Sequence, residues 1–270
     1  LFGSGNLLEA FENNLHGKDA GDHFEFSLSC NEAYGETLAL DDLNLRIESG
    51  EIFGLIGHNG AGKTTTISLL TSIIEATEGL ILVDQLNLAE HRNTIKKRIA
   101  YVPDSPNIFL HLTAYEYWNF MGKVYEVPQN LIDERISKLG QLFDMTTRQH
   151  EPIDSFSHGM RQKTIIIGAL ISNPDIWILD EPLTGLDPQA SFDLKQMMKE
   201  HAAAGNTVLF STHVLSVAEQ LCDRIGILRK GRLIFLGSLD ELKSQYPDKD
   251  LETIYLELAG RQKDKAGEEA

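Results

Sequence analysis

A glycine-rich loop at residues 57–65 constrains the fold of this chain more than any other segment. It consists of Gly57, His58, Asn59, Gly60, Ala61, Gly62, Lys63, Thr64 and Thr65. Glycines let successive backbone N–H groups converge on a polyphosphate because no Cβ stands in the way. The apolar run 52–56 predicts a buried strand before the loop, and the spacing of 65–72 predicts a helix after it. The pattern indicates a phosphate-binding turn; an incidental glycine-rich turn is the alternative.

Two carboxylates follow another apolar run. Residues 176–179 predict a buried parallel strand that ends at Asp180 and Glu181. We expect Lys63 to reach the outer phosphates, and we expect Thr64 and Asp180 to hold Mg²⁺, the carboxylate through water. Glu181 is then placed to orient and deprotonate an attacking water. The alternative is a strand that ends in a solvated acidic turn.

Three shorter motifs accompany the loop and the carboxylates. They are Ser157-His158-Gly159-Met160, Thr184-Gly185-Leu186-Asp187 and, after a strand-like run, His213. In this order, the motifs make the chain resemble the ATPase subunit of ATP-binding-cassette (ABC) transporters, from Phe24 to Leu258. Met160 and the basic residues after it resemble the signature variant of bacterial drug and peptide exporters.

The resemblance implies ATP and Mg²⁺ as cofactors and gives roles to four further residues. Ser157 and Gly159 would contact phosphate from a helix N-terminus, although Ser-x-Gly elsewhere is usually just a helix cap. Asp187 belongs to the loop that crosses the interface between two cassettes. His213 would contact the γ-phosphate and the catalytic machinery; a lone histidine at a strand end is more often a packing residue.

Two positions are assigned on weaker patterns. The family stacks an aromatic ring on adenine, and Tyr34 stands in the matching place, with Phe24 and Phe26 nearby. The family carries a magnesium-sensing glutamine where this chain has Asp104. We expect Asp104 to join the outer magnesium shell; the alternative is a turn residue that opens the segment 104–107.

The expected fold class is α/β, with a P-loop NTPase core, a mostly parallel sheet, an antiparallel β portion and an inserted helical lobe. We expect a tail or linker at 1–22, a single ABC nucleotide-binding domain at 23–258, and a charged C-terminal tail at 259–270, with the helical lobe at about 105–172.

Periodicity predicts the shorter elements. They are strands at 24–28, 43–47, 80–83 and 99–102, a hairpin of 225–228 with 233–236, and two helices within 112–143 that Pro128 divides.

Composition narrows the possible partners. The formal net charge of −16 argues against nucleic acid and against direct electrostatic docking on anionic lipid. No apolar run approaches the roughly 20 residues of a membrane-spanning helix, and no signal peptide is recognised. The two cysteines, Cys30 and Cys222, are typical of a reducing cytosol. We therefore expect attachment to the cytoplasmic face of the cell membrane through a membrane subunit.

The function that the resemblance implies is Mg-dependent ATP hydrolysis that powers transport, and the signature variant implies export. Two cassettes, identical or different, would close head to tail on ATP and drive integral membrane transporter subunits. The alternatives are a soluble cassette ATPase in nucleic-acid or cluster-assembly processes and a weakly hydrolysing regulatory cassette. A group of aromatic residues in the helical lobe could dock the membrane partner or fill the lobe's own core, and we expect one or two of them at the contact surface. The group comprises Tyr115, Tyr117, Trp118 and Phe120.

Overall fold

The computed structural model of this chain describes residues 40–107, 109–247 and 249–265. The expected tail at 1–22, the predicted strand at 24–28 and the adenine-stacking candidate Tyr34 lie outside the described residues. No helix within the described part is long and apolar enough to cross a membrane.

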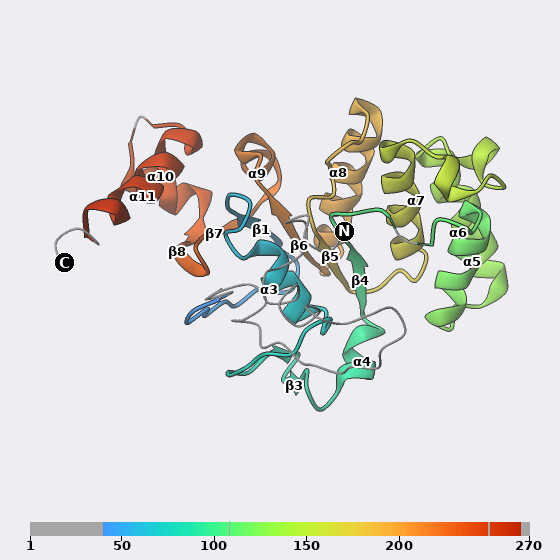
Figure 1. Cartoon of the computed structure of the whole chain (residues 1–270), viewed down its shortest axis with the longest axis horizontal. Helices are drawn as coiled ribbons and strands as arrows, with labels where there is room; N and C mark the ends of the chain where they lie inside the picture. Colours follow the sequence, from blue (N-terminus) through green and yellow to red (C-terminus); the bar gives the residue numbers. More distant parts are fainter. Residues whose placement is uncertain (1–39, 108, 248, 266–270) are drawn as a thin grey trace, which may run out of the picture.

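The centre of the molecule is a mostly parallel sheet, in the order β4-β5-β6-β1-β7-β8 (Figure 1). Its strands are β1 (Ile52–Ile56), β4 (Ile99–Val102), β5 (Ile176–Leu179), β6 (Thr207–Thr212), β7 (Arg224–Arg229) and β8 (Arg232–Ser238). Only β8 runs antiparallel to its neighbour. All five residues of β1 are buried, as expected for a central strand covered on both faces. The predicted α/β fold class is therefore confirmed.

Helices cover the sheet and extend beyond it. They are α3 (Lys63–Leu70), α4 (Arg92–Lys96), α5 (Ala114–Val124), α6 (Gln129–Leu142), α7 (His158–Leu170), α8 (Pro188–Ala203), α9 (Leu215–Leu221), α10 (Leu239–Gln245) and α11 (Leu251–Lys265), with 3₁₀ turns at Thr146–Arg148 and Ile153–Ser155. Figure 1 shows α5, α6 and α7 together at one end of the molecule and α10 and α11 at the other. Pro128 separates α5 from α6, as predicted.

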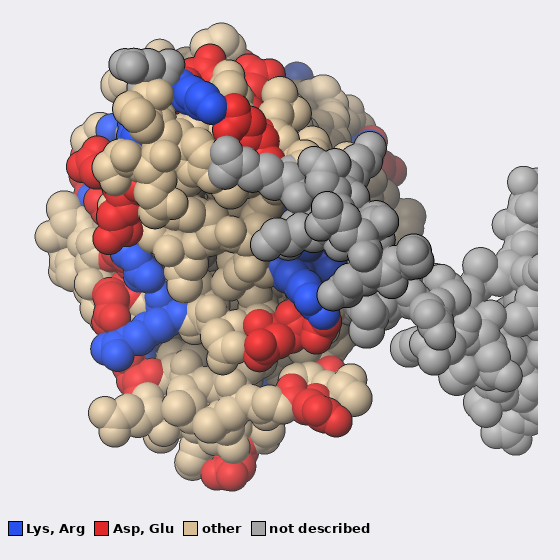
Figure 2. Space-filling view, turned by 90° about the vertical axis from the view of Figure 1, so that its left-hand side faces the viewer, with Lys and Arg blue, Asp and Glu red and all other residues tan. Residues whose placement is uncertain are grey.

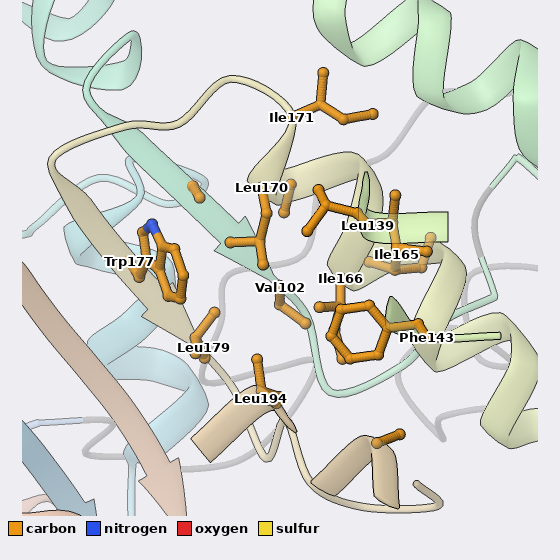
Figure 3. Packing of buried hydrophobic residues seen from close by; sticks show 14 of the residues in the cluster. Val102, Leu139, Phe143, Ile165, Ile166, Leu170, Ile171, Trp177, Leu179 and Leu194 are labelled. Atoms are coloured by element: carbon orange, nitrogen blue, oxygen red, sulfur yellow. The ribbon is translucent and has the colours of Figure 1, made fainter. Parts of the chain in front are cut away.

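The group of helices α5 to α7 is tied to the sheet by one continuous apolar core (Figure 3). Val102 and Leu179 at the ends of two strands pack with Ile166 and Leu170 of α7. Deeper in the group, Trp118 is fully buried and donates its indole N–H to the Thr164 carbonyl at 2.9 Å. The helix that carries the signature motif is thereby held firmly against the sheet.

Two predicted elements differ from the structure. The segment 43–47 has the alternating burial that the pattern predicts, but it is not a strand in the described part of the chain. The strand predicted at 80–83 shortens to β2 (Leu82–Val83), which pairs with β3 (Leu86–Asn87). The hairpin, both helices of 112–143 and the strands at 52–56, 99–102 and 176–179 are confirmed.

One helix begins earlier than predicted, and another extends into the predicted C-terminal tail. The helix predicted at 65–72 begins at Lys63, directly after Gly62 takes the left-handed conformation with φ of 108°. At the C-terminus, α11 is helical to Lys265 and runs through the expected start of the charged tail at residue 259.

A buried histidine makes the stability of the fold depend on pH. His201 of α8 stacks on Trp177 of β5, with ring centroids 4.0 Å apart. Burial lowers the pKa of His201 below its usual 6.5. Below that pH the unfolded chain therefore binds a proton that the folded chain resists, so stability falls as the pH falls.

We expect the free energy of unfolding to decrease below about pH 6.5 by at most about 1.4 kcal/mol per pH unit from this one group. Urea denaturation at several pH values checks the slope, and His201→Gln, which does not titrate, isolates its contribution. Equal slopes for the native chain and the variant would contradict the assignment.

Candidate active site

The glycine-rich loop connects β1 to α3 and wraps around a buried lysine. Lys63 donates its ammonium to the carbonyls of Gly57 at 2.8 Å and His58 at 3.4 Å. Gly60 and Gly62 have φ of 78° and 108°, the left-handed region that favours glycine. No acidic side chain lies in the first turn of α3 and no side chain caps it. The positive end of this helix is therefore open to an anion.

The first predicted carboxylate lies beside the end of the loop. Asp180 follows β5, and its two oxygens accept hydrogen bonds from Thr64 Oγ1 at 2.8 Å and Ser211 Oγ at 2.5 Å. Burial raises the pKa of Asp180; the two hydrogen bonds oppose this shift, and the charges of Asp104 and Glu181 add to it. Asp180 is thus a buried acceptor next to a hydroxyl at the start of α3.

The second carboxylate is held between two cationic or polar groups. Glu181 Oε1 is 3.4 Å from the Lys63 ammonium, and Oε2 is 2.9 Å from His213 Nδ1. Although buried, Oε1 makes no hydrogen bond within the described part of the chain. Glu181 has φ of 48°, a strained value for a non-glycine residue, and its N–H donates to Ser211 Oγ at 3.0 Å. The strained backbone of Glu181 and the absence of a hydrogen bond at its buried Oε1 atom indicate a functional position.

The signature motif and the loop 184–187 form a second, separate group. Ser157 caps α7 by accepting the Met160 N–H at 3.3 Å. A Cβ on Gly159 would lie 2.4 Å from the Gly185 carbonyl oxygen, so only glycine allows these two segments to touch. Asp187 caps α8 and pairs with Lys163 of α7 at 2.6 Å.

The residues of this second group are partly or fully exposed, and they bond mainly to one another and to the starts of α7 and α8. Ser157 and Asp187 are exposed and Gly159 is half-buried. In the described residues, Ser157 and Asp187 make no hydrogen bond or ion pair with Lys63, Asp180 or Glu181. In this part of the chain, the loop 184–187 bonds to the site only through the Thr184 N–H, which donates to the Glu181 carbonyl at 3.1 Å. The structure thus brings the loop, both carboxylates and His213 into direct contact with one another, and among the described contacts Ser157, Gly159 and Asp187 bond to none of them.

Asp104 lies close enough to influence the site electrostatically. It is exposed and follows β4. Its charge contributes to the raised pKa of Asp180. It contributes in the same way to Tyr101, whose pKa burial raises to about 12. The described contacts give Asp104 no direct bond to either residue.

Ser211 is a site residue that the sequence reasoning missed. It is fully buried in β6 and bonds both Asp180 and the backbone of Glu181. The available signal was a serine directly after the apolar run 208–210, two positions before His213. A buried hydroxyl needs hydrogen-bonding partners, which a neighbouring strand end supplies.

The donors present fit Mg²⁺. The described residues contain no group of three or more histidine, cysteine or acidic residues that could enclose a metal. Mg²⁺ needs no such cage, because it keeps several waters and takes one or two protein oxygens together with substrate phosphates. Thr64 Oγ1 and Asp180 Oδ2, 2.8 Å apart, supply such oxygens.

We expect Ser211→Ala to lower the free energy of unfolding by about 1–3 kcal/mol, because it leaves buried polar groups on Asp180 and Glu181 without a partner. The same change should raise the pKa of Asp180 further. Ser172→Ala, which removes one hydroxyl bonded to the Ala169 carbonyl, is the matched control. Urea denaturation compares the two variants, and an equal, small loss in both would show that Ser211 has no special role.

Known proteins resemble the chain in sequence. The family model described as ABC transporter matches residues 40–184. The chain is 34% identical over 219 residues to the ABC transporter ATP-binding protein NatA of Bacillus subtilis (strain 168), covering 81% of this chain and 89% of NatA. It is 32% identical over 222 residues to the Nod factor export ATP-binding protein I of Cupriavidus metallidurans (strain ATCC 43123 / DSM 2839 / NBRC 102507 / CH34), covering 82% of this chain and 73% of that protein.

Solved structures agree with these matches. The structure of an ATP-binding subunit of an ABC transporter superposes with a TM-score of 0.78 at 34% identity, covering 82% of this chain and 93% of that one. A dimeric ATP-binding cassette in a post-hydrolysis state, bound to ADP and Pi, superposes with a TM-score of 0.68 at 25% identity, covering 74% and 90%. The chain belongs to the ABC transporter family, as an ATP-binding subunit that hydrolyses ATP.

Proposed function

We propose that Glu181 is the general base of ATP hydrolysis in this chain and that the hydrolysis powers export in a head-to-tail pair of cassettes. The observation that carries the proposal is the position of Glu181 between Lys63 and His213, at 3.4 and 2.9 Å. A base held by an ion pair with Lys63 and by the contact with His213 Nδ1 is oriented before the substrate arrives, which is what general base catalysis requires.

Each residue of the assembled site has a chemical task. Backbone N–H groups of the loop and the Lys63 ammonium bind the β- and γ-phosphates. Glu181 accepts a proton from water as the oxygen attacks the γ-phosphorus, and the bond to the ADP oxygen breaks. His213 holds Glu181 and donates toward the γ-phosphate. Mg²⁺, when bound by Thr64 and Asp180, neutralises phosphate charge.

Asp104 is proposed as an outer magnesium neighbour. Its charge acts on Asp180, the residue proposed to hold the metal. A carboxylate at this position would accept a hydrogen bond from a metal-bound water.

The second cassette supplies the groups that this site lacks. Ser157, Gly159 and Asp187 have no described bond to the loop, and Ser157 and Asp187 are exposed, so this group is available to the ATP of another copy. The likeness to a cassette solved as a dimer with ADP and Pi supports this arrangement. ATP bound between two cassettes stabilises the closed pair, and its hydrolysis removes that stabilisation.

The direction of transport is proposed as export. The relative that is named for Nod factor export and the Met160 variant of the signature support it. A nucleic-acid function is less favoured, because the net charge is −16 and acidic and basic side chains alternate on the face that carries α10 and α11 (Figure 2). A regulatory, weakly hydrolysing role is less favoured because Lys63, Asp180, Glu181 and His213 are assembled.

An exposed apolar patch on the helical group is the proposed contact with the membrane subunit. Tyr117 and Trp118 are buried, whereas Phe109, Phe120 and Val124 are 47%, 44% and 54% exposed. The rings of Phe109 and Phe120 are 5.5 Å apart, so they form one surface. Exposed apolar groups of this kind mark protein interfaces. Binding there would place the chain at the cytoplasmic face of the membrane.

We expect Glu181→Gln to bind Mg-ATP normally, accumulate a closed dimer and lose roughly 10²- to 10⁴-fold in kcat, because the amide cannot take the proton. Turnover assays and light scattering with ATP measure these effects. Glu200→Gln, an exposed change on α8, is the matched control. Native turnover by Glu181→Gln would overturn the general-base assignment.

We expect Phe120→Asp to reduce the fraction of the chain that sediments with membranes of its host by about tenfold or more, because a charged side chain would replace an apolar one in the proposed contact with the membrane subunit. Its ATPase rate without membranes should stay native. Phe192→Asp alters another exposed phenylalanine, 63% exposed on α8, and serves as control. Equal membrane association of both variants would show that the patch does not bind the partner.

A further inference from the structure

The C-terminal helix α11 contacts the glycine-rich loop from outside the site described above. The hydroxyl oxygen of Tyr255 accepts the backbone N–H of His58 at 3.1 Å, across 197 positions of sequence. The His58 ring lies edge-on to the tyrosine ring, with centroids 5.0 Å apart at 75°. Tyr255 is 6% exposed, so this contact is sheltered from water.

The helix is fixed in this position by its own packing. Asp250 caps its first turn by accepting the Thr253 N–H at 2.8 Å. Leu251 and Ile254 are fully or almost fully buried, in a cluster that includes Ala218 of α9 and Ile56 of β1. Ile56 is the last residue before the loop. Tyr255 therefore reaches the loop from a rigid base.

The peptide groups of His58 lie at the junction of several hydrogen bonds. Its N–H is bonded to Tyr255, and its carbonyl accepts the Ala61 N–H at 3.1 Å and the Lys63 ammonium at 3.4 Å. The Gly231 N–H in turn donates to the Ala61 carbonyl at 2.9 Å. The orientation of His58 thus affects the turn of the loop and the lysine.

Because the His58 N–H is bonded to Tyr255, it is not one of the donors offered to phosphate. In the described part of the chain, four other N–H groups of the loop donate no hydrogen bond: those of Asn59, Gly60, Gly62 and Lys63. These are the donors that a phosphate would take. A preorganised loop binds more tightly because less ordering remains to be done on binding.

We propose that Tyr255 is a positioning residue for nucleotide binding: its hydroxyl orients the His58 peptide, and with it the loop and Lys63. The inference rests on the proposed nucleotide site at 57–65. It extends the site to α11, which lies beyond the region 40–184 that the family model matches.

Tyr255→Phe tests this, because it keeps the ring and removes only the hydroxyl. We expect the Kd and KM for Mg-ATP to rise about 2- to 10-fold, the effect of one hydrogen bond, with kcat changed little. We also expect faster hydrogen exchange of the loop amides without nucleotide, measured by mass spectrometry. The control is Tyr125→Phe, which removes a hydroxyl bonded to the Ile99 carbonyl at 3.0 Å in the helical group. It should lower the melting temperature without changing Kd.

The outcomes separate this inference from the proposed function. If Tyr255→Phe binds Mg-ATP and exchanges its loop amides as the native chain does, while Lys63→Ala loses binding, the positioning role is overturned and the nucleotide site stands. If Lys63→Ala also binds normally, the nucleotide site itself is wrong. A Kd rise of the same size in Tyr125→Phe would also overturn the inference, because it would show a general loss of stability.

His58→Pro removes the N–H itself and gives a second test. In that background Tyr255→Phe should have no further effect on Kd, because the bond is already lost. A further rise of the same size as in the native chain would overturn the role of this hydrogen bond.

Discussion

The parallel pairing of β5, β6 and β1 decides where every reacting group lies. In this register Leu179 is opposite Phe210, and Ile56 is opposite Thr212. The residues that follow the three strands therefore emerge together at one edge of the sheet: the loop after Ile56, Asp180 after Leu179 and His213 after Thr212. Parallel strands bring distant segments together in this way because their carboxyl ends share one edge.

Ser211 ties this edge together. It is buried in the middle strand of the three and bonds Asp180 and the backbone of Glu181. The hydrogen bond from the Glu181 N–H to Ser211 Oγ helps to hold the strained backbone of Glu181 in place. Glu181 Oε1, which makes no hydrogen bond in the described part of the chain, is paired with the buried ammonium of Lys63 at the point where a γ-phosphate is expected.

Packing against the sheet also fixes the position of elements far from this edge. The helix α7 carries the signature and is anchored by its apolar face, so its exposed start has a defined position relative to the sheet. The contact of Gly159 with Gly185 and the pair of Lys163 with Asp187 join it to the loop before α8. A displacement of the start of α7 therefore also displaces the loop before α8. This coupling is useful if both segments contact the same second cassette.

Local patterns were sufficient where the signal lies in a short segment. The strand before the loop, the helices divided by Pro128 and the hairpin around residue 230 are each specified by a few neighbouring residues, and all three are confirmed. The segment 43–47 shows the limit: its alternation predicted a strand, and the structure has the alternating burial without a strand. A strand is defined by its bonds to another segment, which a local pattern does not specify. The order of motifs predicted Lys63, Asp180, Glu181 and His213 as candidates, and the structure brings them together.

The sequence by itself determined the chemical groups and the resemblance to the family, because the motifs that carry them are short segments that can be recognised by their residues and by their order in the chain. Only the tertiary structure decided that Ser211 bonds the Asp180 carboxylate and the Glu181 backbone N–H, and that Tyr255 reaches the loop across 197 positions. The physical reason is that these bonds depend on sheet register and helix packing, which sum many weak contacts between distant residues.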